Sequence, residues 1–183
     1  MIERKIISNA VGKIAWGYIF IHLNFNLGSI NLLPDWIGYF LIVSSLNTVG
    51  GVEKSALLLK TPGYCAAAWC AVLWMINIFG LAPDSFIYNM VDMILSIVML
   101  YFHFQLLTNL AEVAEKYMCP HKPKLLVLRN MRTVLITFLY LPLPFEESPW
   151  LMYAALAVSM VVMVWTCACL FSLKKSTLIF VKP

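Results

Sequence analysis

Ionisable and amide side chains interrupt the apolar segments of this chain at helical spacing. Between 85 and 107, Ser85, Asn89, Asp92, Ser96 and His103 follow one another at intervals of four, three, four and seven residues, which places them on one helical face. A carboxylate and an imidazole on such a face can relay a proton or bind a polar ligand. Because an ionised group in hydrocarbon costs on the order of 3 kcal/mol, this face is predicted to point away from lipid.

A second polar face precedes it, where His22, Asn26 and Ser29 are spaced by four and three residues. At about 1.5 Å per residue, His22 and Asp92 lie at similar predicted depths, so the two side chains can pair. Hydrogen bonding between helices is the alternative role; it is favoured for the asparagines and serines and stays open for Asp92. The predicted ligand-binding or proton-relay candidates are His22, Asn26, Asn77, Asn89, Asp92 and Ser96.

Acidic residues gather in turns and offer a different chemistry. Asp35, Asp84, Glu146 and Glu147 could surround a divalent cation, although an acidic residue at a helix start is already explained by the helix dipole. The sequence has no phosphate-binding glycine loop, no zinc-protease helix and no Gly-x-Ser-x-Gly motif. We therefore predict no catalytic residue, no metal and no cofactor; the sequence leans against an enzyme and leaves the question open.

Composition identifies the elements that must position these groups. Of 183 residues, 62% are hydrophobic and 12% charged, and the mean hydropathy is +0.84. A water-soluble domain of this size could not bury that much apolar surface, and uninterrupted apolar runs favour helices over strands. The predicted fold is an all-α polytopic transmembrane bundle forming a single integral membrane domain over 1–183.

Six apolar runs are long enough to be candidate spans, at about 11–32, 36–49, 64–81, 85–107, 125–141 and 149–173. The second is the shortest, and Pro34, Gly38 and the Gly50-Gly51 pair keep a re-entrant helix open as an alternative. The basic residues after Met1 resemble the start of a signal peptide, but no small-residue cleavage site follows, so the first run is interpreted as a retained span.

Basic residues orient the predicted spans. All 13 fall at the termini or in the connections after spans two and four: Arg4, Lys5, Lys13, Lys54, Lys60, Lys116, Lys122, Lys124, Arg129, Arg132, Lys174, Lys175 and Lys182. The positive-inside rule therefore predicts that both termini are cytoplasmic. Four of these residues, Lys122, Lys124, Arg129 and Arg132, are also candidates for contact with anionic lipid headgroups.

The connections carry further signals. Three outer turns each combine proline with an acidic residue, which allows an arrangement of three consecutive helical hairpins, although good helix-start chemistry used three times is the favoured explanation. Beyond the fourth span, Leu106, Leu110, Val113 and Tyr117 recur at helical spacing, with Glu112 and Lys116 four residues apart. This pattern predicts a cytoplasmic helical extension within 108–124, broken at Cys119-Pro120.

Small and aromatic residues complete the prediction. The five cysteines lie in the inner half of the predicted membrane or in the cytoplasm, so they are interpreted as small packing residues and not as disulfides. Gly63, Ala67 and Ala71 share a face that neighbouring helices can approach closely. Trp36, Tyr39, Trp150 and Tyr153 are interpreted as an interfacial aromatic belt.

The segment Asn31-Leu-Leu-Pro-Asp-Trp-Ile-Gly-Tyr39 resembles one found in small, uncharacterised multi-pass membrane proteins of Gram-positive bacteria. The resemblance covers roughly the first 50 residues. It implies a bacterial plasma membrane and implies no activity.

Three functions remain open at this point. A transporter or ligand-binding membrane module would use the polar faces as a pocket in the outer half of the bilayer. A non-catalytic scaffold would bind a membrane partner subunit or form a homo-oligomer, and a membrane-embedded enzyme would act on lipid or peptide at the outer surface. The lipid bilayer is the expected partner in each case, and a small polar ligand or ion in the first. Nucleic acid is not expected, because membrane topology accounts for the net charge of +4.

Overall fold

The computed structural model describes residues 2–23, 26–27, 30–31, 33–81, 85–140 and 149–179. Within these ranges the chain is almost entirely helical. The elements in chain order are α1 (Ile2–His22), β1 (Asn26–Leu27), β2 (Ile30–Asn31), α2 (Asp35–Gly50), the 3-10 helix η1 (Lys54–Leu59), α3 (Lys60–Ile78), α4 (Phe86–Lys116), α5 (Lys122–Tyr140) and α6 (Pro149–Ile179). The two short strands pair antiparallel, with Asn26 opposite Asn31.

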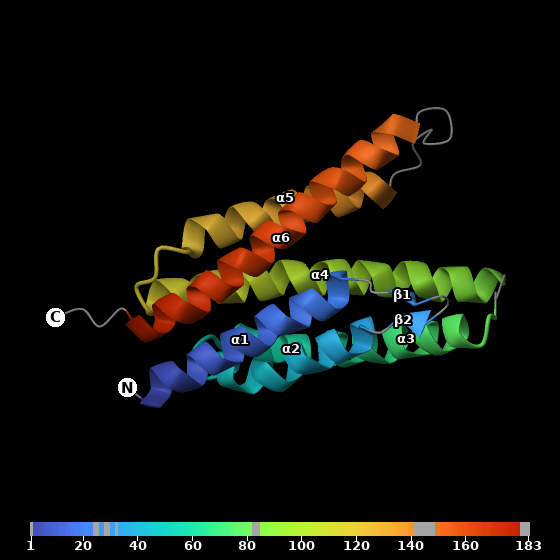
Figure 1. The fold of residues 1–183 in the computed structure, drawn as a ribbon. Helices are drawn as coiled ribbons and strands as arrows, with labels where there is room; N and C mark the ends of the chain where they lie inside the picture. Colours follow the sequence, from blue (N-terminus) through green and yellow to red (C-terminus); the bar gives the residue numbers. More distant parts are fainter. Residues whose placement is uncertain are drawn as a thin grey trace.

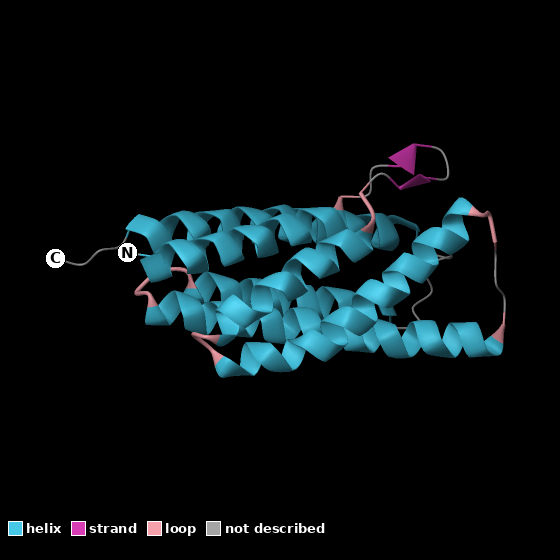
Figure 2. Cartoon of the chain, turned by 90° about the horizontal axis from the view of Figure 1, so that it is seen from below, coloured by secondary structure: helices cyan, strands magenta, loops and turns pink. Residues whose placement is uncertain are grey.

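The helices lie side by side in one bundle (Figures 1 and 2). Each helix packs against the next one in the chain, and α6 returns to pack against α1. The contacts of α2 with α3 and of α4 with α5 are more extensive than those of α3 with α4 or α5 with α6. The bundle is therefore a continuous ring of helices, and the three predicted hairpins are not separate packing units.

The start of α1 and the end of α6 lie at one end of the bundle, which we call the basic end (Figure 1). The connection from α2 to α3 and the turn from α4 to α5 lie there too. The strand pair lies at the opposite end, where the short ladder projects beyond the neighbouring helices (Figure 2). The basic residues in those connections therefore share one end of the molecule.

Three segments are long and apolar enough to cross a membrane: Lys54–Ile78, Phe86–Lys116 and Trp150–Ile179. Many of their large apolar side chains face outward. Ile97 of α4 is 61% exposed and Val161 of α6 is 64% exposed. Contiguous apolar surface of this kind on a soluble monomer would be an aggregation hazard, whereas lipid is a suitable solvent for it.

The first predicted span differs from the helix observed. Helix α1 begins at Ile2 and ends at His22, whereas the prediction placed a span over about 11–32. The residues that follow include Asn24, Asn26 and Gly28, all of low helix propensity. Within this segment, Asn26–Leu27 forms β1 and Ile30–Asn31 forms β2. His22 is therefore the last residue of its helix and does not lie in the middle of a span.

The predicted extension of the fourth span is confirmed as a helix. Helix α4 continues without interruption to Lys116, and the periodic residues Leu106, Leu110, Val113 and Tyr117 are all buried. Of the two charged residues four apart, Glu112 pairs with Lys122 at 3.2 Å, and Lys122 also contacts Glu115 at 2.6 Å. The Lys116 ammonium donates to the Val52 carbonyl.

Glycines set the closest helix contacts. A Cβ atom on Gly38 of α2 would lie 2.5 Å from the Gly17 carbonyl oxygen of α1, and a Cβ on Gly17 would lie 2.7 Å from the Gly38 oxygen. At Gly63 of α3, an added Cβ would lie 2.4 Å from Val43 and 2.8 Å from Phe102. The predicted close approach to the α3 small-residue face is therefore confirmed at Gly63.

The turn from α4 to α5 holds a buried histidine at the basic end. His121 is 6% exposed, and its Nε2 lies 2.9 Å from the Ser172 hydroxyl of α6. Burial, aided by the nearby charge of Lys124, lowers the pKa of His121 below its ordinary value of 6.5. The folded protein therefore binds this proton less readily than the unfolded chain, so the stabilising contribution is present above pH 6.5 and declines as the pH falls below that value.

We expect the melting temperature of the detergent-solubilised protein to fall between about pH 7.5 and pH 5.5. His121→Gln removes the titrating group and keeps a hydrogen-bonding side chain for Ser172, so its pH profile should be flatter than that of the parent. Thermal unfolding followed by circular dichroism at matched ionic strength measures both profiles. Superimposable profiles would show that His121 does not contribute.

Candidate functional site

Two tyrosines and a histidine from three helices form a hydrogen-bonded chain inside the bundle. Tyr18 of α1 is 0% exposed, and Tyr39 of α2 and His103 of α4 are each 3% exposed. The Tyr39 hydroxyl lies 3.0 Å from His103 Nε2, and His103 Nδ1 lies 3.2 Å from the Tyr18 hydroxyl. Both ring nitrogens of this buried imidazole are therefore satisfied.

The chemistry of imidazole constrains these two hydrogen bonds. In a neutral histidine one ring nitrogen donates and the other accepts, so one tyrosine hydroxyl donates to His103 and the other accepts from it. The arrangement with Tyr39 donating and the one with Tyr18 donating both satisfy the ring. The chain Tyr39–His103–Tyr18 is thus compatible with two proton arrangements that differ in the tautomer of one imidazole.

His22 and Arg132 extend this chain toward α5. The Arg132 guanidinium donates from Nη1 to His22 Nε2, so that this ring nitrogen carries no proton. The same guanidinium lies 5.5 Å from the centre of the Tyr18 ring, and the His22 and His103 rings are 5.9 Å apart. We call these five residues, Tyr18, His22, Tyr39, His103 and Arg132, the polar cluster.

The positive charge of Arg132 has neutral neighbours only. Among the described residues no carboxylate lies within 4.0 Å of it, since both ion pairs found there belong to Lys122. Its Nε is buried and has no hydrogen-bond partner in the described part of the chain. Stacking on the Tyr18 ring compensates for part of the lost hydration. An imidazole acceptor and an aromatic face do not neutralise the charge.

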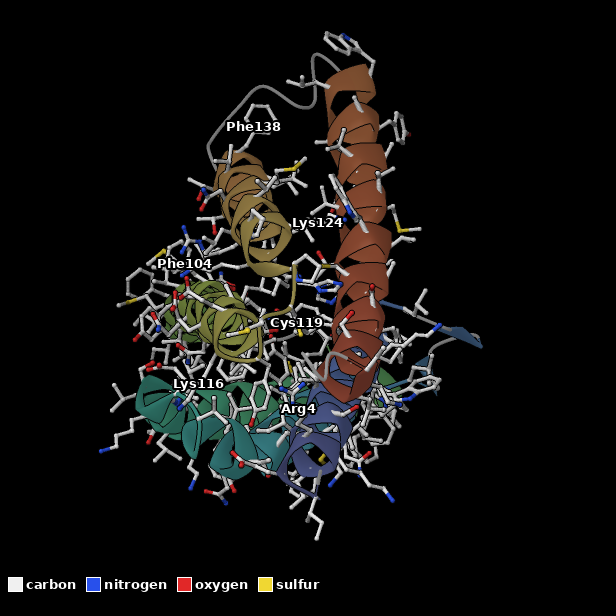
Figure 3. All side chains as sticks on the ribbon, turned by 90° about the vertical axis from the view of Figure 1, so that its left-hand side faces the viewer. Arg4, Phe104, Lys116, Cys119, Lys124 and Phe138 are labelled. Atoms are coloured by element: carbon white, nitrogen blue, oxygen red, sulfur yellow. The ribbon has the colours of Figure 1, made fainter. Side chains whose placement is uncertain are left out.

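Arg132 lies about 15 Å from the start of α5, at 1.5 Å per residue, and its guanidinium faces the bundle interior. Arg132 thus contacts His22 and Tyr18, and its contact with anionic lipid stays a prediction. Lys122 pairs with Glu112 and Glu115, and Lys124 is exposed near the basic end, where Figure 3 labels it on α5. Arg129 contacts the Phe104 ring and the Thr108 hydroxyl of α4.

The predicted His22 and Asp92 partners are different in the structure. His22 belongs to the polar cluster, whereas Asp92 accepts a hydrogen bond of 2.9 Å from the Trp69 indole of α3. Ser96 lines a separate cavity, Asn77 and Asn89 are exposed, and Asn26 is in β1. Of the five predicted ligand-binding candidates whose side chains the structure describes, it therefore brings His22 alone into the polar cluster.

The polar face predicted on α4 is buried only at its His103 end. Asn89 is exposed and Asp92 is half-buried. The beginning of α4 extends beyond the end of α1 (Figure 1), so fewer neighbouring helices cover it. The expectation that the whole face points inward is wrong at Asn89 for this reason.

One of the four predicted divalent-cation residues lies in the described part of the chain. Asp35, at the start of α2, is half-buried, and its Oδ1 has no partner among the described residues. Asp84, Glu146 and Glu147 lie outside the described residues. Within the described ranges, no three His, Cys, Asp or Glu side chains are placed to hold a metal ion. All five cysteines are free thiols.

Sequence reasoning missed three members of the polar cluster. Tyr39 was assigned to an aromatic belt, yet it is buried and bonded to His103, so that assignment is wrong. Trp150 and Tyr153 are 69% and 64% exposed and agree with the belt. Two available signals were the four-residue interval between Tyr18 and His22 and the depth of Arg132 within its helix.

Comparison of this chain with models of protein families, with curated proteins and with solved structures finds no match.

Proposed function

We propose that this chain is a small multi-pass membrane protein whose six helices all cross a bilayer, with both termini on the cytoplasmic side. An even number of crossings agrees with the start of α1 and the end of α6 lying at one end (Figure 1). The basic residues of the α2–α3 and α4–α5 connections lie at that end, as the positive-inside rule requires. A bacterial plasma membrane is the setting that the resemblance of the Asn31–Tyr39 segment implies.

The second helix is the critical one for this topology. Helix α2 has 16 residues and spans about 24 Å, which is shorter than the roughly 30 Å of a bilayer core. Its C-terminal end lies at the basic end, and its N-terminal end lies beside the end of α1, short of the far ends of α3 and α4 (Figure 1), so a full crossing by α2 requires a thinner bilayer at this helix. Local thinning of the bilayer accommodates a short span at modest cost.

We infer that the protein binds a small anionic solute at the polar cluster, as a transporter or ligand-binding module. The observation that carries this proposal is the Arg132 guanidinium, which has neutral contacts and an unpartnered Nε among the described residues. Arginines at membrane depth commonly pair with another group or mark a ligand pathway. A carboxylate or another oxyanion would neutralise the positive charge of Arg132 and accept a hydrogen bond from its Nε.

The surroundings of Arg132 suit this role. The Tyr39–His103–Tyr18 chain fixes the aromatic wall on which the guanidinium lies. His22 is at the end of α1 remote from the basic end, so a solute would enter from the outer half of the bilayer (Figure 1). The tautomer exchange open to His103 would allow a proton to accompany the anion.

The scaffold and enzyme alternatives have weaker support. The α3 small-residue face, which a partner subunit would use, is occupied at Gly63 by Val43 and Phe102 of the same chain. The enzyme alternative requires a cation between acidic turns, and of those residues only Asp35 is described. Neither alternative accounts for Arg132.

We expect chloride, sulfate, phosphate, acetate or succinate to raise the melting temperature of the purified protein. An anion at a hundred times its dissociation constant adds about 2.7 kcal/mol, or about 5–11 °C for a chain of this size. Arg132→Gln should abolish the increase, and Arg132→Lys should retain part of it. Thermal unfolding in detergent at constant ionic strength measures the effect.

Lys124→Gln is the matched control, because it removes one positive charge from an exposed position on the same helix. It should respond to anions as the parent does. If no anion in the panel stabilises the parent, or if Lys124→Gln and Arg132→Gln lose the response equally, anion binding at the polar cluster is excluded.

A further inference from the structure

A cavity of about 320 Å³ lies between α4 and α5, away from the polar cluster. Its walls are formed by Met93, Ser96, Ile97 and Leu100 of α4 and Thr137 of α5. Met93 and Ile97 are 55% and 61% exposed, so the cavity opens on the lipid-facing surface. At about 30 Å³ for a water-sized group, it holds roughly ten methylene groups.

Arg129 lies in the same groove, nearer the basic end. Its guanidinium carbon is 4.4 Å from the centre of the Phe104 ring, Nη1 donates to the Thr108 hydroxyl at 3.1 Å and Nε donates to the Asn130 side chain at 3.0 Å. These neighbours are neutral, and no carboxylate of the described residues lies within 4.0 Å of Arg129. Figure 3 labels Phe104 on α4, on the side where α5 packs.

The helix register joins Arg129 to the cavity. Helices α4 and α5 are antiparallel, and the Arg129–Thr108 contact aligns them. About eight residues farther along each helix, or about 12 Å at 1.5 Å per residue, lie Leu100 and Thr137, both of which line the cavity. One groove therefore has a cation at its basic end and an apolar cavity about 12 Å deeper.

We propose that this groove binds one acidic phospholipid, with the phosphodiester at Arg129 and an acyl chain in the cavity. The remaining guanidinium N–H groups are available to phosphate oxygens, which arginine binds in a bidentate manner. The cavity is deeper in the membrane than Arg129, as an acyl chain is deeper than its headgroup. Acidic lipids are abundant in the cytoplasmic leaflet, which faces the basic end in the proposed topology.

A second hollow in the protein provides a comparison. It is formed on α6 by Met160, Val161, Val164, Trp165 and Ala168, with a volume of about 380 Å³. Its lining is apolar and includes no charged residue. An apolar hollow is therefore found at both places. The arginine at the basic end of the α4–α5 groove is the feature that selects an acidic lipid.

The test is lipid binding to the delipidated full-length chain, measured by native mass spectrometry. The probes are phosphatidylglycerol and phosphatidylcholine with identical acyl chains, and inorganic phosphate. We expect the parent to bind phosphatidylglycerol about tenfold more tightly than phosphatidylcholine, a difference of about 1.4 kcal/mol. Arg129→Gln should remove this preference, Arg129→Lys should retain part of it, and Thr137→Trp should weaken the binding of both lipids by filling the cavity.

Two control variants separate this site from general effects. Lys175→Gln removes an exposed charge from α6, and Val164→Trp fills the α6 hollow; both should bind lipid as the parent does. Equal binding of the two lipids by the parent would overturn the proposal. It would also fail if inorganic phosphate displaced phosphatidylglycerol, or if Lys175→Gln lost the preference as Arg129→Gln does.

Discussion

Replacing Gly38 by alanine is expected to destabilise the protein, although alanine favours a helix over glycine by about 1 kcal/mol. The new Cβ would lie 2.5 Å from the Gly17 carbonyl oxygen and 2.6 Å from Ile21 Cγ1. A backbone oxygen cannot rotate away, so α1 and α2 must separate along their contact. Overpacking of this kind costs about 1–3 kcal/mol, and Gly38→Leu should prevent accumulation of the folded protein altogether.

Thermal unfolding in detergent and the yield of monodisperse protein measure both Gly38 variants. Gly51→Ala is the control, because its nearest contact would be 3.4 Å and its φ of −66° suits alanine; its stability should change by less than about 0.5 kcal/mol. Gly17→Ala should resemble Gly38→Ala, since its Cβ would lie 2.7 Å from the Gly38 oxygen. If Gly38→Ala is more stable than the parent, the two helices are not held at this distance.

The helices were largely predictable, because apolar runs and turn residues are local features of the sequence. The second predicted span, 36–49, differs from α2 by one residue at each end, and the periodicity of Leu106 and Leu110 correctly predicted the extension of α4. The error at α1 has a local origin too. Apolar residues continue beyond His22, but the asparagines and glycine among them do not favour a helix.

The polar cluster was much less predictable, because its members meet only through tertiary packing. Periodicity places Tyr39 on a helical face, but it does not say that His103 of α4 covers that face. Arg132 was explained by membrane topology together with twelve other basic residues. That explanation left no reason to ask where its side chain points.

Asp92 illustrates the same difficulty from the other side. A carboxylate at membrane depth is costly, which made His22 an attractive partner. In the structure, Asp92 instead accepts a hydrogen bond from the indole N–H of Trp69. The sequence pattern of α3 does not distinguish Trp69 from its apolar neighbours. Sequence spacing identified the groups that need partners, whereas helix packing determined which partners they have.

Replacing His103 by leucine is expected to have the second large effect on stability. The substitution leaves the Tyr18 and Tyr39 hydroxyls buried without their imidazole partner, and each unsatisfied hydroxyl costs about 1–3 kcal/mol. We therefore expect a loss of about 3 kcal/mol or more. Tyr39→Phe should cost less than His103→Leu, because it removes one hydrogen bond and leaves His103 its contact with Tyr18. Denaturation in detergent, followed by circular dichroism, compares the variants.

A triple variant tests whether hydrogen bonding is the cause. Combining His103→Leu with Tyr18→Phe and Tyr39→Phe removes the donors and acceptors together, and replacing all partners by apolar groups of similar shape is nearly neutral. The triple variant should therefore be more stable than His103→Leu alone, a non-additive result that reports coupling among the three side chains. Tyr101→Phe, at a position of α4 that is 50% exposed, should leave stability unchanged. If the triple variant is as unstable as His103→Leu, loss of packing and not loss of hydrogen bonds explains the effect.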